Sequence, residues 1–460
     1  MTKTLFGTDG VRGLYKQHGV PGEICPPTFY GLAAACAEFS GADTVVLGRD
    51  TRVSGGDLAD AAMRGAYDQG LKVYDLGIAP TPVIGASVER LSSEEGAFGI
   101  SITASHNPEE YNGFKFLWPK GLKPSEAEAR VIEDMFWGMA GSSRSKQNGK
   151  YFDVVSIPYL TETIDKLKSA FGERPLADKT IALDTANGAA ANYTSLIFKA
   201  LGARVIHIDK PGGKINDGCG ANDLALATRF IEQYSEASDK DFLGVLANDG
   251  DGDRVMGVCK VDGKIVKITG NHIMYYLAQG QPGIVGTDYT NSGLVKKLRE
   301  ENIAFEYCEN GDSNVTEALI IKQQEGRQWT RGGEFTGHLI DTDHLMSGDG
   351  VYMAAWFACK VASLDETFAN VYKELPLWHE KMQNIKLVPG IEIANDPETI
   401  SFINDTAKSV AGVVRIHTRG SGTEPVYRIW AESAVERKLN ETVNKLSAFI
   451  TSRVGVLSQK

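Results

Sequence analysis

The sequence predicts an α/β protein built from several domains. The chain has 460 residues, more than a single hydrophobic core usually organises, so about three or four domains are expected. Short apolar segments rich in β-formers alternate with Ala-rich helical segments, as they do in layered α/β folds. The clearest strand segments are 44–48, 99–103, 180–184 and 205–208, and a clear helical segment is 58–70.

The order of elements suggests where the domains end. The polar segment 141–150 (GSSRSKQNGK) follows a predicted helix at 132–139, which places a boundary near residue 150. A second α/β part runs from there to an acidic segment that interrupts the predicted strand 242–246 and leads into the strand 255–261. We therefore expect a third part to begin at the acidic segment.

The last part of the chain has a different pattern. A helical stretch over 350–375 ends before Pro376. The remainder then alternates strand, helix, strand, strand and helix, the last helix covering 435–452, which is typical of a small α+β domain. The predicted domains are 1–150, 151–248, 249–375 and 376–460.

Composition excludes several classes of function. Charged residues make up 23% and hydrophobic residues 42% of the chain, an ordinary globular mix. The net charge of -11 gives no general attraction for nucleic acid or an anionic membrane, so we expect neither as a partner. The six cysteines contain no C-x-x-C pair, which indicates a reducing compartment rather than a disulfide framework. The chain has no apolar run suited to a signal peptide or a membrane span, so we expect a cytoplasmic protein.

The segment 249–254 (DGDGDR) predicts a divalent-cation site. Carboxylate oxygens suit Mg²⁺ or Ca²⁺, and the intervening glycines let the backbone bend enough for the three aspartates to converge. An EF-hand loop begins similarly, but it would need Gly at Arg254 and Glu at Lys260. The alternative interpretation is an acidic surface turn.

The segment 103–108 (TASHNP) contains a candidate nucleophile, Ser105, directly after an apolar run. Asn-Pro favours a turn, so Ser105 is expected at a strand end, where α/β proteins place their chemistry. Taken alone, the segment could be a plain serine turn, and the chain has no G-x-S-x-G hydrolase motif. The metal motif makes a phosphoserine plausible, because Mg²⁺ neutralises phosphoryl oxygens during transfer.

Two further loops carry groups suited to phosphate and sugar. Residues 419–425 (RGSGTEP), followed by Arg428, combine exposed backbone N–H groups with an arginine that can bind phosphate through two hydrogen bonds, although a polar hairpin loop is the alternative. In the GGEFTGH segment, Glu334 and Thr336 could bind sugar hydroxyls, and His338 could move a proton or orient phosphate. A lone histidine is more often structural.

Taken in order, these four loops resemble those of the α-D-phosphohexomutase family. The segments 6–13 (FGTDGVRG) and 48–55 (GRDTRVSG) are similar to the opening of that family, and the resemblance covers essentially the whole chain. It implies three related mixed α/β domains and a fourth, α+β domain of the TATA-binding-protein-like fold around a central cleft. Each domain would contribute one loop.

The resemblance also implies a role for each candidate residue. Ser105 would carry the phosphoryl group and would hold Mg²⁺ together with Asp249, Asp251 and Asp253. The other catalytic residues would be Arg12, His106, Lys115 and His338, which would transfer protons or orient phosphate. Substrate binding would fall to Glu334, Thr336, Arg419, Ser421, Gly422, Thr423 and Arg428.

The implied reaction interconverts a hexose 6-phosphate and a hexose 1-phosphate. Phospho-Ser105 would give its phosphate to the free sugar hydroxyl, which yields a hexose 1,6-bisphosphate. This intermediate, which also serves as activator, would reorient in the site and return its other phosphate to Ser105. The expected partner is a phosphosugar, and the expected assembly is a monomer or a homodimer.

Details of the motifs bear on which sugar is used. The segments 184–190 (DTANGAA) and 215–221 (INDGCGA) resemble the branch of the family that converts glucosamine 6-phosphate to glucosamine 1-phosphate. A mutase for mannose or glucose phosphates and a non-catalytic sugar-phosphate binding protein are the alternatives. Four residues depart from the usual pattern of that branch: Thr103, Asn271, Phe335 and Thr336.

Overall fold

The computed structural model describes residues 5–7, 9–92, 96–139, 150–153, 158–210, 212–234, 241–388, 391, 393–420 and 425–458. These residues divide into two compact units. The main unit contains the chain up to Thr290 and residues 302–374, and the C-terminal unit contains residues 291–301 and the chain from Leu375 onward. No helix within the described ranges is both long and apolar enough to cross a membrane.

The N-terminal part of the main unit is a six-stranded sheet covered by helices. Its strands are β1 (Val11–Leu14), β2 (Thr44–Arg49), β3 (Lys72–Ile78), β4 (Ala97–Ile102), β5 (Tyr111–Leu117) and β6 (Lys150–Asp153), in the order β1-β5-β4-β2-β3-β6. Strands β2, β3, β4 and β6 are parallel, and β5 is antiparallel to β4 and β1. The helices are α1 (Pro26–Ser40), α2 (Gly55–Asp68), α3 (Thr81–Leu91), the 3₁₀ turn η1 (Pro119–Gly121) and α4 (Glu126–Met139).

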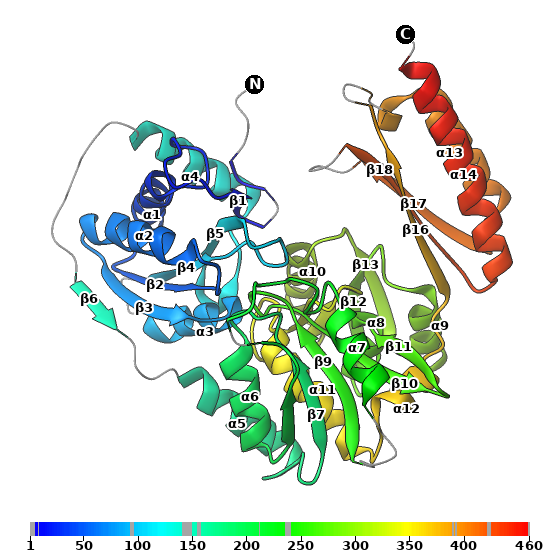
Figure 1. Ribbon diagram of the computed structural model, residues 1–460, viewed down its shortest axis with the longest axis horizontal. Helices are drawn as coiled ribbons and strands as arrows, with labels where there is room; N and C mark the ends of the chain where they lie inside the picture. The colour runs from blue at the N-terminus through cyan, green and yellow to red at the C-terminus, as the bar shows by residue number, and fades with distance from the viewer. Residues whose placement is uncertain are drawn as a thin grey trace. The chain divides into compact units, whose positions relative to one another are not determined.

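The apolar runs of the sequence are explained by this first sheet. Strands β2 and β4 are central and buried, because α1 and α2 cover one face and α3 packs against the other (Figure 1). Helix α1 begins with Pro26 and Pro27 in its first turn, and it ends at Gly41, whose left-handed φ of 64° few other residues adopt at low cost. These signals define a helix that the sequence analysis did not name.

The second sheet has the order β11-β10-β9-β7-β8. Its strands are β7 (Thr180–Asp184), β8 (Arg204–His207), β9 (Phe242–Asn248), β10 (Val255–Val261) and β11 (Lys264–Ile268). The helices packed around it are α5 (Pro158–Phe171), α6 (Ala191–Ala200), α7 (Ala225–Gln233), α11 (Gly350–Ser363) and α12 (Phe368–Glu374). The acidic segment joins β9 to its antiparallel neighbour β10, so it lies at the end of a buried strand.

The third sheet of the main unit is smaller. It has the order β13-β12-β14-β15, formed by β12 (Gly283–Thr287), β13 (Ala304–Cys308), β14 (Arg331–Gly333) and β15 (Leu339–Asp341). Helices α8 (Gly270–Ala278) and α10 (Asp312–Gln324) pack on it. The GGEFTGH segment is the turn between β14 and β15, which pair antiparallel.

The C-terminal unit is an antiparallel sheet with helices. It contains β16 (His379–Lys386), the 3₁₀ turn η3 (Ile393–Asn395), α13 (Pro397–Ser409), β17 (Val414–Gly420), β18 (Val426–Ser433) and α14 (Glu436–Leu457), with the strand order β16-β18-β17. This matches the predicted α+β succession. The unit also contains α9 (Ser292–Glu300), a segment that precedes it in the chain by many residues.

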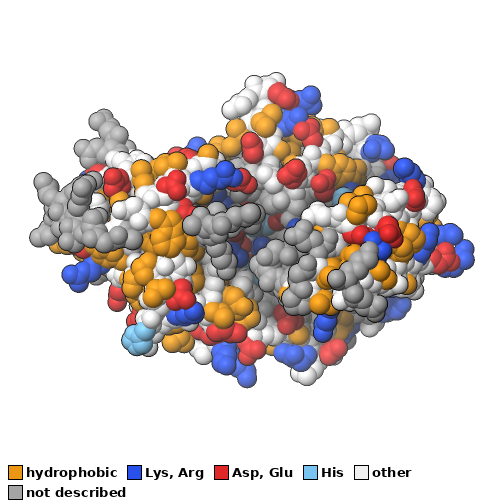
Figure 2. All heavy atoms as spheres, turned by 90° about the horizontal axis from the view of Figure 1, so that it is seen from above, with side chains coloured by type: hydrophobic (Ala, Val, Ile, Leu, Met, Phe, Trp, Pro, Cys, Tyr) orange, Lys and Arg blue, Asp and Glu red, His pale blue; other side chains and the backbone are white. Residues whose placement is uncertain are grey.

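The predicted α/β class and the named strands are confirmed, whereas the division into four domains stays a prediction. The polar segment expected to end the first domain lies, up to Gly149, outside the described residues. Strands β10 and β11 extend the second sheet although they follow the acidic segment. Acidic and basic side chains are interspersed over the face drawn in Figure 2.

Candidate active site

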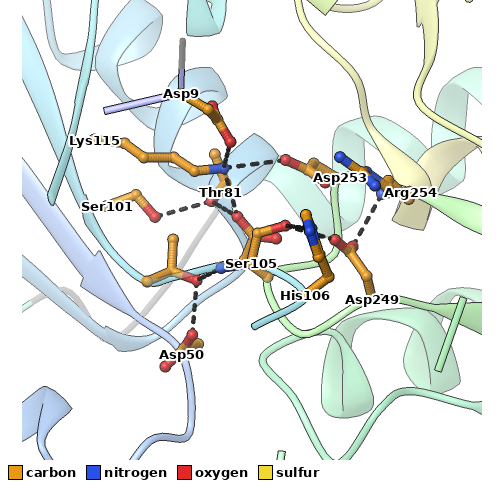
Figure 3. A network of polar contacts seen from close by, with 12 residues as sticks. Asp9, Asp50, Thr81, Ser101, Ser105, His106, Lys115, Asp249, Asp253 and Arg254 are labelled. Carbon is orange, nitrogen blue, oxygen red and sulfur yellow. Dashed lines mark hydrogen bonds and ion pairs between the residues drawn. The ribbon is translucent and has the colours of Figure 1, made fainter. Parts of the chain in front are cut away.

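Ser105 lies in the turn between β4 and β5, and its side chain points to the acidic segment. Its backbone φ of 50° is in the left-handed region, which is uncommon for a residue other than glycine. The hydroxyl donates a hydrogen bond to Asp249 Oδ2 at 2.9 Å, and His106 Nδ1 lies 3.3 Å from Ser105 Oγ (Figure 3). A residue that looked like an ordinary serine turn is therefore in contact with the predicted metal ligands.

Gly250 explains why the two loops can approach so closely. A Cβ atom at this position would lie 2.7 Å from the carbonyl oxygen of Ser105, a distance at which the backbone would have to shift. The glycines of the acidic segment therefore do more than bend the chain. At position 250, glycine also leaves room for the serine loop of the first sheet.

The three carboxylates of the acidic segment converge as predicted. One oxygen from each of Asp249, Asp251 and Asp253 lies within 4.8 Å of the others, and all three residues are buried. Asp251 Oδ1 and Asp253 Oδ1 are buried and accept no hydrogen bond from the described residues. Carboxylate oxygens left in this way are the hard donors that a divalent cation prefers, so the donor set fits such a cation.

The chain supplies its own positive charge beside these carboxylates. Lys115 Nζ lies 2.8 Å from Asp251 Oδ2, 3.2 Å from Asp253 Oδ2 and 3.2 Å from Asp9 Oδ2. Thr81, at the start of α3, donates its hydroxyl hydrogen to the same oxygen of Asp251 at 2.8 Å. Each of these groups engages Oδ2 of Asp251, which leaves Oδ1 for another ligand.

The pKa values of the aspartates are pushed in opposite directions. Burial raises the pKa of Asp249 well above its usual range, and the charges of Asp253 and Asp251 raise it further. Burial would also raise the pKa of Asp253, but Lys115, His338 and Arg254 together hold it below its usual range. Asp249 is therefore the carboxyl group of the site that accepts a proton more readily, and Asp253 is the one that stays ionised.

His106 is held in its neutral form. Burial is the main cause that lowers the pKa of this imidazole to about 4, and the positive charges of Arg254 and Arg12 contribute. At neutral pH the ring is therefore unprotonated. A neutral ring whose Nδ1 is 3.3 Å from Ser105 Oγ can accept a proton from that oxygen.

A chain of ion pairs continues from Lys115 toward the third sheet. Asp9 is in contact with Arg12 and Lys123, the latter at 2.5 Å. Lys123 also lies 2.6 Å from Asp312 Oδ2 at the start of α10. The predicted residue Arg12 thus belongs to the same charged network as Lys115, although its bridge, Asp9, was not singled out from the sequence.

His338 lies at the end of this network. Its Nε2 is 3.2 Å from Asp312 Oδ2, and its Nδ1 is 3.9 Å from Asp253 Oδ1. The approach to the acidic segment is fixed by backbone, because His338 forms an isolated antiparallel bridge with Arg254. The structure therefore places this histidine beside the candidate metal ligands.

The rest of the GGEFTGH segment is held from within the third sheet. Glu334 is buried and accepts the backbone N–H of Gly311 at 3.0 Å, and the Thr336 hydroxyl donates to its other oxygen at 3.4 Å. The ring of Phe335 is 6.2 Å from that of Tyr289. Thr336 thus provides a hydroxyl group next to Glu334, as a serine at this position would.

The C-terminal unit contains the remaining candidates. Arg419 on β17 and Arg428 on β18 are direct cross-strand partners, so their side chains leave the same face of the antiparallel pair. Two guanidinium groups on one face form a positively charged patch suited to a phosphate. Three predicted residues of this loop lie outside the described residues: Ser421, Gly422 and Thr423.

Several polar residues of the site were not found from the sequence. Asp9 belongs to the FGTDGVRG segment and Arg254 to the DGDGDR segment, so the motifs contained a signal for them. Thr81, Lys123 and Asp312 belong to no motif. They reach the site only because the first and third sheets place α3, the segment after η1 and α10 around the acidic loop.

Comparison with known proteins assigns this arrangement to a family. Residues 3–140 match the model of the phosphoglucomutase/phosphomannomutase α/β/α domain I, and residues 264–377 match that of domain III. The chain is 31% identical to the phosphoglucosamine mutase of Pseudoalteromonas translucida and 32% identical to that of Deinococcus radiodurans, with 98% of each chain covered in both cases.

Solved structures of the same family share the fold. A phosphoglucomutase/phosphomannomutase family protein from Burkholderia thailandensis has a TM-score of 0.74 at 21% identity, with 98% of each chain covered. The Aspergillus fumigatus N-acetylphosphoglucosamine mutase, solved with GlcNAc-6P and magnesium, has a TM-score of 0.61 at 14% identity and covers 97% of this chain and 95% of its own. With relatives at this identity over nearly its full length, the chain belongs to the α-D-phosphohexomutase family.

Proposed function

We propose that the protein interconverts glucosamine 6-phosphate and glucosamine 1-phosphate, with Ser105 as the carrier of the transferred phosphoryl group. The observation that carries this proposal is the 2.9 Å hydrogen bond from Ser105 Oγ to Asp249 within the buried carboxylate cluster. The curated relatives that cover nearly the whole chain are phosphoglucosamine mutases, which supports glucosamine as the sugar.

Mg²⁺ is the cofactor that the donor set favours. Asp249, Asp251 and Asp253 would hold it, together with an oxygen of the phosphoryl group on Ser105. When bound, the ion neutralises negative charge on the phosphoryl oxygens and so favours transfer. The two carboxylate oxygens that accept no hydrogen bond from the described residues support this assignment.

The chain's own residues would handle the protons. In the first transfer, the bond between phosphorus and Ser105 Oγ breaks, a bond from phosphorus to the sugar oxygen forms, the sugar hydroxyl gives its proton to a base of the site, and Ser105 Oγ takes up a proton. In the return step, Ser105 Oγ gives up that proton and bonds to the other phosphorus of hexose 1,6-bisphosphate, the bond from this phosphorus to the sugar oxygen breaks, and the sugar oxygen takes up a proton. His106 can accept the proton of Ser105 Oγ because its ring is neutral and 3.3 Å away.

Lys115 would stabilise charge during both transfers. It is buried, and the charges of Asp251, Asp9 and Asp253 overcome the effect of burial and raise its pKa well above the usual value. It therefore stays an ammonium group and supplies fixed positive charge beside the phosphoryl group. Arg12 and His338, which belong to the same network of ion pairs, would orient phosphate or move the second proton.

The two other loops would bind the substrate. Glu334 and Thr336 would contact sugar hydroxyls, and the buried carboxylate of Glu334 is already held by the Gly311 N–H. The paired arginines Arg419 and Arg428 would bind the phosphate that is not transferred. We assign Ser421, Gly422 and Thr423 to the same task on the strength of their motif.

A mutase for mannose or glucose phosphates is the main alternative. Thr103, one of the four departures named above, is the one that resembles the mannose/glucose branch. It is fully buried, and both hydrogen bonds of its hydroxyl are internal: the hydroxyl donates to Asp50 at 2.7 Å and accepts from Ser105 N at 2.8 Å. A serine would make the same bonds. The contacts of Thr103 therefore do not select the sugar, and the departures in the GGEFTGH segment, Phe335 and Thr336, are the ones that could.

A substrate panel tests the proposal. The phosphorylated, Mg²⁺-loaded protein is incubated with the 6-phosphates of glucosamine, mannose or glucose and a trace of hexose bisphosphate, and 1-phosphate is followed by phosphorus NMR. We expect the highest kcat/KM for glucosamine 6-phosphate and no turnover after the metal is removed with EDTA. A preference for mannose or glucose would overturn the sugar assignment, and binding without any turnover would favour a sugar-phosphate binding protein.

A further inference from the structure

The backbone around Ser105 is held by an unusual number of side-chain donors. Its left-handed φ of 50° costs free energy for a residue with a Cβ, so surrounding groups must maintain it. The loop has no regular secondary structure of its own between β4 and β5. Its conformation therefore depends on partners elsewhere in the chain.

Arg52 supplies the first set of these partners. Its five N–H groups are all used: Nε donates to Asp50 at 2.9 Å, and the two terminal nitrogens donate to four carbonyl oxygens of the loop. Both Arg52 and Asp50 are fully buried. The four carbonyl groups belong to Ser105, Asn107, Pro108 and Tyr111.

Asn216 supplies a second set from another part of the fold. Its Nδ2 donates to the carbonyl oxygen of Ser105 at 2.8 Å and to that of Asn107 at 3.0 Å. These are the same two oxygens that one terminal nitrogen of Arg52 contacts. Asn216 follows β8 of the second sheet, and its own φ is 58°, so the loop of one sheet is fastened to that of the next.

Both recorded hydrogen bonds of the Asn216 side chain go to the backbone of the serine loop, and neither goes to Ser105 Oγ or to the carboxylates. The backbone N–H of Asn216 is itself held by the carbonyl group of Ala186. Asn216 therefore cannot act in the chemistry directly. What it can set is the position of the Ser105 backbone, and with it the direction of Oγ toward Asp249. A displacement of about 1 Å at a reacting group can cost on the order of 100-fold in rate.

We propose that Asn216 is a positioning residue that, with Arg52, fixes Ser105 in its left-handed conformation for phosphoryl transfer. This inference rests on the proposed function of Ser105. Arg52 holds four carbonyl groups inside the core, so its replacement would disturb folding. Asn216 is the position at which an effect on chemistry can be separated from an effect on stability.

Two variants make this separation. Asn216→Gly removes both donors while keeping a residue that readily adopts a positive φ. Asn216→Asp keeps the size of the side chain but replaces the N–H donors with an oxygen. The matched control is Asn302→Gly, because Asn302 is exposed, has a φ of 59° and lies in the turn between α9 and β13.

We expect both Asn216 variants to lose about 10- to 100-fold in kcat with KM changed by less than about threefold. Both variants should stay folded at the assay temperature, with melting temperatures lowered by no more than about 5 °C, and the Asn302→Gly variant should keep full activity. Wild-type kcat in Asn216→Asp would overturn the inference, because packing alone would then suffice. A kcat loss matched by a loss of folded protein would overturn it too.

The phosphorus NMR signal of phospho-Ser105 distinguishes this failure from a failure of the proposed function. We expect the signal to shift in Asn216→Gly and not in Asn302→Gly. If the unchanged protein carried phosphate on Ser105 but turned over no sugar phosphate, the proposed mutase reaction would fail, and the NMR shift would still decide the positioning role. An unchanged signal in Asn216→Gly would contradict that role.

Discussion

Each unit contains buried carboxylate charge within a cluster of polar groups, and the two clusters differ in how the chain satisfies them. In the C-terminal unit, the fully buried Glu432 accepts the Ser292 N–H at 3.0 Å and the Ser292 hydroxyl at 2.5 Å, and Arg415 Nε lies 2.7 Å from it. In the main unit, Asp251 and Asp253 each keep one buried oxygen that accepts no hydrogen bond from the described residues. The first cluster is complete without a ligand, and the second is not.

This difference separates a structural use of buried charge from a functional one. Glu432 joins the N-terminus of α9 to β18, which explains why α9 belongs to the C-terminal unit. The acidic loop instead crowds three carboxylates together beside Lys115, and it leaves two of their oxygens without a hydrogen bond from the described residues. Substitutions should therefore change stability at the first cluster and activity at the second.

The largest expected effect is at Asp251. Asp251→Asn removes one charge of the candidate metal site while keeping the shape of the side chain, so we expect kcat/KM to fall by about 1000-fold or more. The protein should stay folded, because Lys115 keeps Asp253 and Asp9 as ion-pair partners. Enzyme assays measure the loss of activity, and titration calorimetry measures the accompanying loss of Mg²⁺ affinity.

The control for this variant is Asp262→Asn, which changes an exposed aspartate in the turn between β10 and β11. It should leave activity and Mg²⁺ affinity unchanged. If the activity of Asp251→Asn stayed within tenfold of that of the unchanged protein, the unpaired oxygens of Asp251 and Asp253 would not bind a ligand needed for catalysis. The functional use of buried charge in the main unit would then be contradicted.

The next effect is a pH dependence of stability at Asp184, a buried carboxylate whose partners include the backbone N–H groups of Ala186 and Gly220. Burial raises its pKa to about 7, above the value of about 4 in an unfolded chain. The folded state therefore binds more protons in this window. Stability from this group is present at low pH and is lost as pH rises from about 4 to about 7, by roughly 3 kcal/mol.

Asp184→Asn should remove this slope. Urea unfolding at a series of pH values measures this slope. As pH rises, we expect the unfolding free energy of the unchanged protein to fall relative to that of the variant. Asp165→Asn, at an exposed position of α5, should run parallel to the unchanged protein. Parallel curves for Asp184→Asn would mean that Asp184 is ionised throughout.

The smallest expected effect is at Glu432. Glu432→Gln turns an amide N–H toward the donors of Ser292, so we expect a loss of about 2 kcal/mol in the stability of the C-terminal unit. Hydrogen exchange in α9 should rise, whereas phosphorylation of Ser105 should not change. Glu436→Gln, on the exposed first turn of α14, is the control, and equal stability of the two variants would contradict the structural role of Glu432.

The sequence analysis predicted what local patterns encode. The strand over 180–184 and the strand over 255–261 match β7 and β10 residue for residue, because buried strands leave continuous apolar runs. The convergence of the three aspartates was predictable for a similar reason, since their spacing and the glycines lie within one short segment.

What local patterns could not supply are contacts across the fold. Thr81 and Lys123 reach the acidic network from segments without any motif, and Asn216 reaches Ser105 from a different sheet. The membership of α9 in the C-terminal unit is another such case, because Ser292 and Glu432 are far apart in the sequence. These contacts depend on the packing of whole sheets, which periodicity does not encode.

Phosphopeptide mass spectrometry measures directly whether Ser105 carries the phosphoryl group. The protein is charged with hexose 1,6-bisphosphate, digested and analysed before and after addition of glucosamine 6-phosphate, with Ser101, a second serine of the same sheet, as internal control. We expect one phosphoryl group on Ser105, and we expect it to be lost when glucosamine 6-phosphate is added. The Ser105→Ala variant should show neither phosphorylation nor turnover. Phosphorylation of another residue, or turnover by Ser105→Ala, would contradict this role of Ser105.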